Sequence, residues 1–544
     1  MTADGNADLA DAARQDAGDT GIPTWTPEAI GRVPENAAPA FIFRALTRED
    51  PAAERAPEAG DAASPTARAE GTTDAGADVG VATALFDGVA ALSRLLRARQ
   101  VSSVELTRLA LDLHDRRGRP LNAVAELTPD LALAEARQAD REIAAGRYRG
   151  PLHGIPYGAK DLLATRGIPT RWGSPAHRDQ VFDYDAAVIE RLHAAGAVLV
   201  AKLAMEELAG GGGHQTPGAS LDGPCRNPWD PARWAGGSSG GSGAAVGAGL
   251  VGFAIGTETW GSIMVPAAFC NVTGLRPTYG RVSRHGAMAL SWTMDKIGPL
   301  SRTAEDCALI LAAIAGHDPR DPSSLPGAFA LDAPPAVARF LRLGILPQTY
   351  REGHAVARER FEAALGVLRA TGYDARPIAL PDFPYGLATE TIIDAEGAAA
   401  FEGLIRGPRL ALLVDDARRR GFRAALAIPA VDYLRAMQIR ALAAPAALAV
   451  FDAVDVLVAP TLLRGTPPIA PPLSVSWRGM GGNGGPGNLL GWPSISVPMG
   501  ADGAGLPLGL ELIGPPGGEA TILALAIAYQ RATDWHRTCP PRAP

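Results

Sequence analysis

The sequence predicts an α/β protein whose central sheet is largely buried. Three observations support this fold class. Apolar residues recur at helical spacing in several segments. Short runs rich in Val and Leu lie between those segments, as expected for buried strands. This alternation continues to the end of the 544-residue chain.

The first predicted helices follow residue 84, where leucines begin to recur at helical spacing. Ser102 and Ser103 stand before Glu105, a pattern typical of a helix start. Residues 131–146 and 185–195 predict two further helices.

Short apolar segments between turn-forming residues predict the strands. They are residues 197–201, 454–458, 494–498 and 508–513. The Gly- and Pro-rich residues 465–487 predict a long surface loop. No repeat or linker interrupts the remaining pattern, so we expect one catalytic domain over residues 81–544.

Residues 1–80 are rich in Ala, Asp, Glu, Gly and Pro and predict a mostly flexible N-terminal extension. The acidic start lacks a basic segment followed by an apolar core, so we expect no secretory signal. The four cysteines are scattered, which indicates neither a disulfide framework nor a zinc site. We therefore expect a cytoplasmic protein.

The formal net charge is −7 and the sequence pI is about 5.8. General binding to nucleic acid or to an anionic membrane needs clustered Lys and Arg, so this composition disfavours both. The longest apolar stretches are interrupted by Gly, Pro and polar residues, so we expect no membrane span.

The most unusual segment is the Gly/Ser-rich run 236–243, which leads into the apolar residues 244–251. A flexible linker would not continue into a helix that must be buried. The segment is not followed by Gly-Lys-Ser/Thr, so a phosphate-binding P-loop is not supported. A nucleophile elbow requires a strand directly before the serine, whereas residues 227–231 contain two prolines and predict a loop.

A fourth interpretation accounts for more residues. Residues 237–242 (GSSGGS), 256–263 (GTETWGSI) and 154–161 (GIPYGAKD) resemble the motifs of the amidase signature family. The motifs occur in the family's order, and the resemblance covers roughly residues 85–535. It implies the amidase-signature fold, with a large mixed central sheet covered by helices on both faces.

The resemblance also implies the catalytic residues. Ser262 is expected to attack the acyl carbon. Ser238, held in a cis peptide, is expected to relay the proton of Ser262 to Lys160, which receives it as a neutral amine. A serine hydroxyl needs such a base because it is a weak nucleophile. Burial can supply the neutral amine because desolvation disfavours the charged form of lysine.

The backbone amides of Thr259, Trp260 and Gly261, followed by that of Ser262, lie where the family forms its oxyanion hole. The implied reaction needs no metal and no organic cofactor. Positions matching the family's substrate pocket are Gly210, Gly211, Ser239 and Trp292. The glycine run at 210–213 is also compatible with a close-packed turn.

Three residues depart from the family's usual pattern. Glu258, Trp260 and Met264 stand where Asp, Gly and Arg are common. The Trp260 ring either narrows the acyl pocket, stacks on an aryl substrate or points into the core. Met264 removes a guanidinium that could hold a carboxylate on the substrate.

We expect a stand-alone amidase that hydrolyses a small or aryl amide. Whether it also hydrolyses esters or carbamates is left open. The expected partner is a small-molecule amide, with no nucleic acid and no membrane; a homodimer is left open. The alternative is the glutaminase (A) subunit of a tRNA-dependent amidotransferase. A non-catalytic binding protein is disfavoured because Lys160, Ser238 and Ser262 are all present.

Overall fold

The structure is a computed structural model that describes residues 81–211, 216–330, 341–346, 354–470, 472–473 and 484–541. The predicted N-terminal extension lies outside these residues, as does the middle of the predicted loop 465–487.

The described strands form one mixed sheet of eleven strands, in the order β1-β3-β2-β4-β6-β5-β10-β11-β9-β7-β8. Strand β2 runs parallel to both β3 and β4, and β7 runs parallel to β8 and β9. The remaining pairs are antiparallel. The strands are β1 (Val124–Leu127), β2 (Pro156–Lys160), β3 (Val198–Leu203), β4 (Phe253–Glu258), β5 (Thr273–Arg276), β6 (Lys296–Ser301), β7 (Leu343–Ile345), β8 (Ala375–Pro377), β9 (Val456–Pro460), β10 (Ser494–Ala501) and β11 (Pro507–Ile513).

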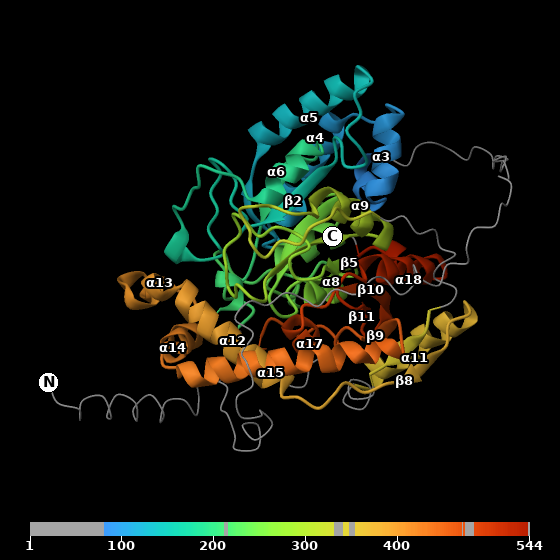
Figure 1. Cartoon of the computed structure of the whole chain (residues 1–544). Coiled ribbons are helices and arrows are strands. Elements are labelled where there is room, and N and C mark those ends of the chain that lie inside the picture. Colours follow the sequence, from blue (N-terminus) through green and yellow to red (C-terminus); the bar gives the residue numbers. More distant parts are fainter. Residues whose placement is uncertain are drawn as a thin grey trace.

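Helices cover both faces of the sheet (Figure 1). Strand β5 shows this directly: Thr273 accepts a hydrogen bond from Gln530 of α18, whereas a Cβ at Gly274 would meet Ala267 of α8. The longer helices are α3 (Val89–Arg97), α4 (Ser103–Leu113), α5 (Pro129–Ala144), α6 (Ala187–Ala194), α7 (Gly240–Gly247), α8 (Met264–Cys270), α9 (Ala304–Ile314), α11 (Ala355–Ala370), α12 (Tyr385–Ala400), α14 (Asp416–Ala425), α15 (Ala430–Leu448) and α18 (Glu519–Arg531). Shorter ones are α13 (Glu402–Arg406) and α17 (Gly484–Leu489).

The predicted helix start at Ser102 is confirmed. Its hydroxyl accepts the Glu105 N–H, and the Glu105 carboxylate accepts the Ser102 N–H, which forms a capping box. The predicted strands are also present, but 454–458 is shifted to Val456–Pro460 (β9). Asp455, just before this strand, pairs with Arg342.

The Gly/Ser-rich run becomes buried helix α7, so the linker interpretation is excluded. Close approach of other main chains explains its glycines: a Cβ at Gly241 would lie 2.5 Å from the Ala204 nitrogen, and one at Gly243 would lie 2.9 Å from the Pro266 oxygen.

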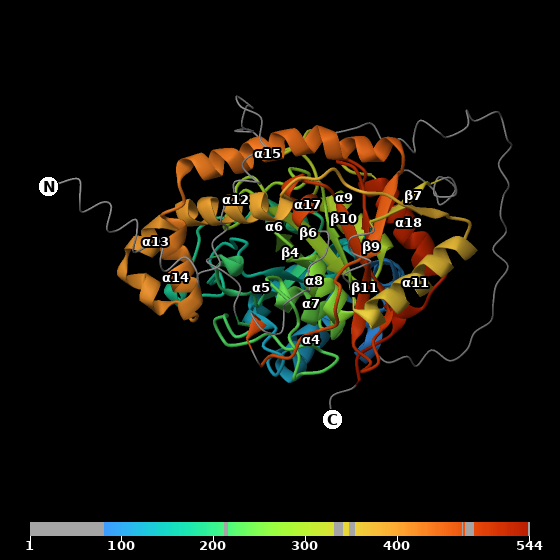
Figure 2. The same cartoon turned by 90° about the horizontal axis from the view of Figure 1, so that it is seen from below.

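Helices α12 and α15 lie side by side at the edge of the molecule (Figure 2). The segment Ala430–Asp452, which contains α15, is long and apolar enough to cross a membrane by length and composition alone. In this fold Met437 and Ile439 are buried in a second apolar cluster shared with Ile392 of α12. The apolar composition of α15 is therefore also explained by its place in the core of the fold.

Candidate active site

Lys160, Ser238 and Ser262 form a continuous line of hydrogen-bonding atoms. The Lys160 Nζ donates to Ser238 Oγ at 2.7 Å, and Ser238 Oγ lies 3.0 Å from Ser262 Oγ. Lys160 also donates to Thr257 Oγ1 at 2.9 Å. Exposure falls along the line, from 6% at Ser262 to 1% at Ser238 and 0% at Lys160. The hydroxyls can rotate, so the same atoms can pass a proton from Ser262 inward to the amine.

The topology explains why these residues meet. Lys160 ends β2, and the turn that carries Ser262 follows the parallel neighbour β4. The ends of two adjacent parallel strands lie at the same edge of a sheet. Ser238 precedes α7, which packs on β4 and β2, and its peptide bond with Gly237 is cis, as the resemblance implies.

Burial lowers the pKa of Lys160 to about 7, although the carboxylates of Asp295, Glu206 and Glu258 oppose this shift. At neutral pH, a large fraction of the amine is therefore uncharged. An amine with this pKa is suited to act as a general base near pH 7.

The turn after β4 presents unused main-chain donors beside the Ser262 hydroxyl. The N–H groups of Trp260, Gly261 and Ser262 have no hydrogen-bond acceptor among the described residues. Gly261 has φ +79°, which favours glycine in this turn. Consecutive free N–H groups next to a nucleophile are suited to bind an oxyanion.

The Glu258 carboxylate binds the main chain directly after Ser262. Its Oε2 accepts the N–H groups of Ile263 and Met264 at 2.8 and 3.0 Å, and its Oε1 accepts from Arg276 and Asn488 at 2.7 and 2.9 Å. Burial alone would raise the pKa of Glu258, but Arg276, Lys296 and Asn488 together outweigh burial and lower the pKa to about 2. The departure from Asp therefore retains a charged anchor for the turn.

Asp295 supports the turn from the other side. Its Oδ1 accepts the Thr259 hydroxyl at 2.6 Å, and its Oδ2 accepts the N–H groups of Leu290 and Ser291. This contact fixes Thr259 and also places a carboxylate charge near Lys160. The sequence gives no sign of the bond between Asp295 and Thr259, which joins residues 36 positions apart.

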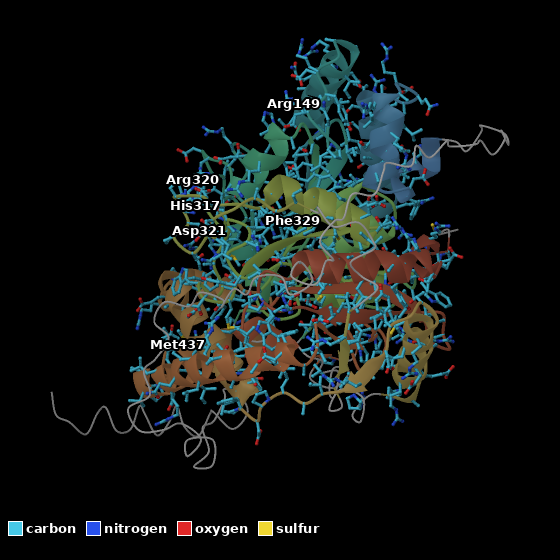
Figure 3. All side chains as sticks on the ribbon, turned by 45° about the vertical axis from the view of Figure 1, so that its right-hand side comes forward. Arg149, His317, Arg320, Asp321, Phe329 and Met437 are labelled. Carbon is cyan, nitrogen blue, oxygen red and sulfur yellow. The ribbon has the colours of Figure 1, made fainter. Side chains whose placement is uncertain are left out.

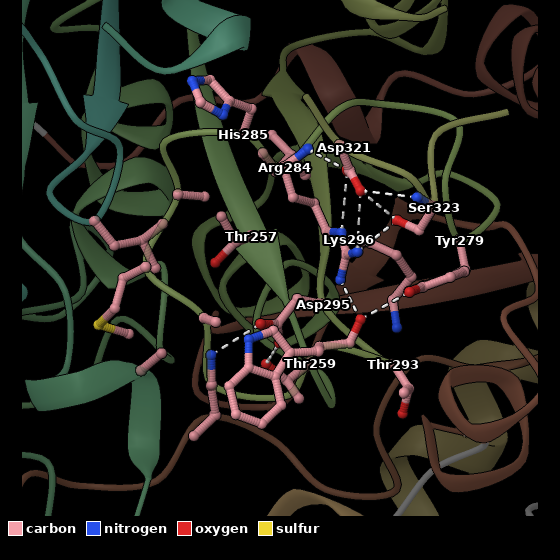
Figure 4. A pocket seen from close by; sticks show the side chains of 18 of the residues that line it. Thr257, Thr259, Tyr279, Arg284, His285, Thr293, Asp295, Lys296, Asp321 and Ser323 are labelled. Atoms are coloured by element: carbon pink, nitrogen blue, oxygen red, sulfur yellow. Dashed lines mark hydrogen bonds and ion pairs between the residues drawn. The ribbon is translucent and has the colours of Figure 1, made fainter. Parts of the chain in front are cut away.

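A cavity of about 600 Å³ adjoins Thr257 and Thr259 (Figure 4). Trp292 lines this cavity and is 46% exposed. Arg320 and Asp321 belong to the lining and lie close to His317 on one side of the molecule (Figure 3). The lining combines apolar side chains such as Met288 and Leu290 with charged ones such as Arg284, and the volume lies in the range of small-molecule sites.

The other predicted pocket residues behave differently. Ser239 is fully buried, and its hydroxyl bonds both the carbonyl and the N–H of Thr257, so it supports the turn instead of facing a ligand. A Cβ at Gly211 would lie 2.9 Å from both Leu290 and Phe422, which makes this segment a close-packed turn. Gly210 is only half-buried and has φ +94°.

Two further motif residues have structural contacts. Asp161 pairs with Lys202 at 3.2 Å, and His153 lies 3.3 Å from Glu142. Neither contacts the line from Lys160 to Ser262. In the part of the chain that the structure describes, no group of three or more His, Cys, Asp or Glu side chains could hold a metal ion.

An amine, two hydroxyls and N–H groups without an acceptor among the described residues, gathered on a mixed α/β sheet, are the groups that a serine hydrolase with a lysine base requires. The chain matches the family model described as Amidase over residues 105–523. The chain belongs to this family, whose amidase signature its motifs carry, and it is an amidohydrolase acting on carbon–nitrogen bonds.

Similar proteins include the (A) subunit of Glutamyl-tRNA(Gln) amidotransferase from Chloroflexus aurantiacus, 40% identical over 83% of this chain and 98% of the relative. The protein of the same name from Geobacter sp. is 38% identical over 82% and 97%. Among solved structures, native peptide amidase from Stenotrophomonas maltophilia is 35% identical with a TM-score of 0.72, covering 82% of this chain and 96% of that one.

These relatives overturn one expectation from the sequence. We expected a small-molecule amide as partner, with no nucleic acid and no membrane, and left a homodimer open. The name of the similar proteins instead describes one component of an enzyme that acts on a tRNA. Net charge misled here because it reports on the whole chain and says nothing about a partner protein that could carry the tRNA contacts.

Proposed function

We propose that the chain hydrolyses the side-chain amide of glutamine as the amide-cleaving component of a tRNA-dependent amidotransferase. The line from Lys160 through Ser238 to Ser262, beside free main-chain donors, is the observation that carries the amide cleavage. The 38–40% identity to components of such enzymes, over nearly their whole length, supports membership of an assembly of this kind. We also propose a cytoplasmic location, where tRNA is available.

Acylation begins when Ser262 Oγ attacks the amide carbon. The Ser262 proton passes to Ser238 Oγ, and the Ser238 proton passes to the neutral Lys160 amine. The carbonyl oxygen becomes an oxyanion that accepts from the N–H groups of the turn, which stabilises the transition state more than the planar amide.

Collapse of the intermediate breaks the carbon–nitrogen bond. Lys160 returns its proton through Ser238 to the leaving nitrogen, so ammonia departs and an ester to Ser262 remains. Water then attacks this ester while the same relay takes up its proton. The relay returns this proton to the Ser262 oxygen as the ester bond breaks, which leaves the free enzyme with Lys160 neutral. The carboxylic acid product loses its own proton to solvent and becomes a carboxylate.

Ser262→Ala tests the nucleophile. Loss of a nucleophile that acts as part of a relay lowers kcat by about a millionfold. Ser242→Ala is a matched control, because its buried hydroxyl bonds only the Ile255 carbonyl and lies outside the relay. Equal activity of Ser262→Ala and the wild type would exclude the relay.

Glutamine hydrolysis tests the substrate and the amidotransferase assignment together. Purified chain should release ammonia from glutamine, and added partner proteins with a glutamate-charged tRNA should accelerate the release. Capture of those partners on the tagged chain should accompany this effect. Absence of both capture and acceleration would reject the amidotransferase assignment.

A second candidate is a stand-alone amidase. Trp260 favours it, because the ring reshapes the oxyanion turn where the family commonly has glycine. The similarity to peptide amidase supports the same view. This candidate predicts full turnover of a simple amide without any partner protein, and the same ammonia assay distinguishes it.

A further inference from the structure

Trp260 lies in the oxyanion turn, two residues before Ser262. Its side chain is 37% exposed, although Thr259 and Ser262 on either side are only 6% exposed. The sequence left its direction open between the pocket and the core. The exposed fraction excludes the core, so the ring reaches the surface beside the turn that carries Ser262.

The ring packs against the first turn of α17. A Cβ at Gly484 would lie 2.8 Å from both Cδ1 and Nε1 of the ring, and a Cβ at Gly485 would lie 3.7 Å from its Cζ2. The first distance is too short for a carbon contact, so only glycine fits at position 484. The large ring at position 260 therefore lies against a residue of α17 that has no side chain, Gly484.

Helix α17 is anchored independently of the ring. Asn488 donates to Glu258 Oε1 at 2.9 Å, and a Cβ at Gly487 would lie 2.6 Å from the Arg276 guanidinium. Both partners are fully buried, so the helix cannot yield toward solvent without breaking these contacts. The ring therefore occupies a fixed position between the oxyanion turn and α17.

We propose that Trp260 determines acyl-group specificity by occupying the space between the oxyanion turn and α17. The space that remains admits an acyl group that is unbranched or flat next to the carbonyl carbon. The side chain of glutamine, with a methylene at that position, belongs to this class. Peptide amides carry a branched carbon there and are excluded. The inference rests on the amide hydrolysis of the proposed function and not on the acceptor of the ammonia.

The test compares kcat/KM for butyramide (unbranched), benzamide (flat) and 2-methylbutyramide (branched next to the carbonyl). The wild type should favour the first two over the third. Trp260→Gly should raise the branched-to-unbranched ratio by about tenfold or more, as expected when a pocket gains room for an added methyl group. Trp260→Phe keeps a ring and should keep most of the selectivity.

A double-mutant cycle tests the contact with α17. Gly484→Ala should lower kcat/KM in the wild type, because the added Cβ collides with the ring, and should have little effect beside Trp260→Gly. Thermal unfolding of each variant reports whether it folds; if Trp260→Gly does not, Trp260→Ala takes its place in both experiments.

An unchanged branched-to-unbranched ratio in a folded ring-less variant would overturn the proposal. An equal cost of Gly484→Ala in both backgrounds would overturn the contact with α17. Failure of the proposed function is distinguishable, because it appears as absent glutamine hydrolysis or absent partners while the amide ratios still shift with Trp260.

Discussion

At the scale of single residues, Lys160 combines full burial with contacts to oxygen atoms only. Its amine has hydroxyl and carbonyl neighbours within hydrogen-bonding distance, but the nearby carboxylates act on it only through their charge. An ion pair would hold the amine in its charged form. The arrangement therefore keeps the base usable near neutral pH.

This burial predicts the pH dependence of activity. The charged amine cannot accept a proton, so kcat/KM should fall by about tenfold per pH unit below the Lys160 pKa of about 7. Above this value the rate should reach a plateau. A pH profile on both sides of this pKa, with a substrate that does not titrate, gives the position of the limb. A flat profile through neutral pH would contradict lysine as the base.

Asp295→Asn tests the same electrostatics from a neighbouring position. The Asp295 charge raises the pKa of Lys160, so its removal should move the acidic limb to lower pH. The lost support of Thr259 should also lower kcat, but this effect does not move the limb. Asp321→Asn, on the rim of the same cavity, is the control and should leave the limb in place.

The reacting residues could be located from the sequence because their motifs are contiguous. The supporting residues could not. Asp295 and Asn488 lie 36 and 230 positions from the turn residues that they contact. Only the fold brings such pairs together, so no local pattern marks them.

At the scale of elements, the nucleophile turn depends on one buried carboxylate. Glu258→Gln removes the charge opposite the buried Arg276, and breaking a buried ion pair typically costs about 3–5 kcal/mol. Denaturant unfolding should show this loss of stability. Glu258→Asp keeps the charge and should lose less. Equal stability of Glu258→Gln and the wild type would show that the pair does not stabilise the turn.

The start of α4 is a second local test. Ser102→Ala removes the hydroxyl that accepts the Glu105 N–H and should lower the free energy of unfolding by about 1 kcal/mol. Ser102→Asp retains an acceptor and should retain most of the stability. Activity should not change in either variant, because α4 contributes no residue to the relay.

Local signals explain which elements the sequence predicts. The capping pattern at Ser102 is sufficient to locate α4, and short apolar runs between turn-forming residues locate β10 and β11. Helix α17 (Gly484–Leu489) begins within the Gly-rich residues 465–487, which predict a loop because glycine disfavours helices in isolation. Its glycines are instead required by the ring of Trp260 and the guanidinium of Arg276.

At the scale of the whole molecule, Glu207 joins the helical layer of residues 402–448 to the sheet. Its carboxylate accepts the Ser174 hydroxyl at 2.7 Å and the Val414 N–H at 3.1 Å, and it lies 3.7 Å from Arg418 of α14. Carboxylate, guanidinium and serine are all fully buried.

Glu207→Gln should therefore loosen α14 as well as lower overall stability, by about 3–5 kcal/mol for a broken buried pair. Hydrogen exchange should show faster exchange in residues 413–425. Glu402→Gln, which breaks the exposed pair with Arg406 in the same layer, should change little because surface pairs contribute about 0–1 kcal/mol. Unchanged exchange in Glu207→Gln would contradict this role.

The class of the fold was predictable, since helices alternate with buried strands along the chain. The strand order was not. Strand β10 pairs with β5 although more than 200 residues separate them, and β2 lies between β3 and β4. Such pairings depend on tertiary packing, which the period of apolar residues does not encode.

The positions of the site residues along the chain have an evolutionary consequence. The relay and the oxyanion turn come from residues 160–262, whereas α17, which packs against the ring of Trp260, comes from residues 484–489. Substitutions in the later stretch can remodel ligand recognition while the inherited chemistry stays intact. Proteins with this architecture can therefore acquire new substrates through substitutions in the later stretch, provided that these substitutions remain compatible with the side chain at position 260.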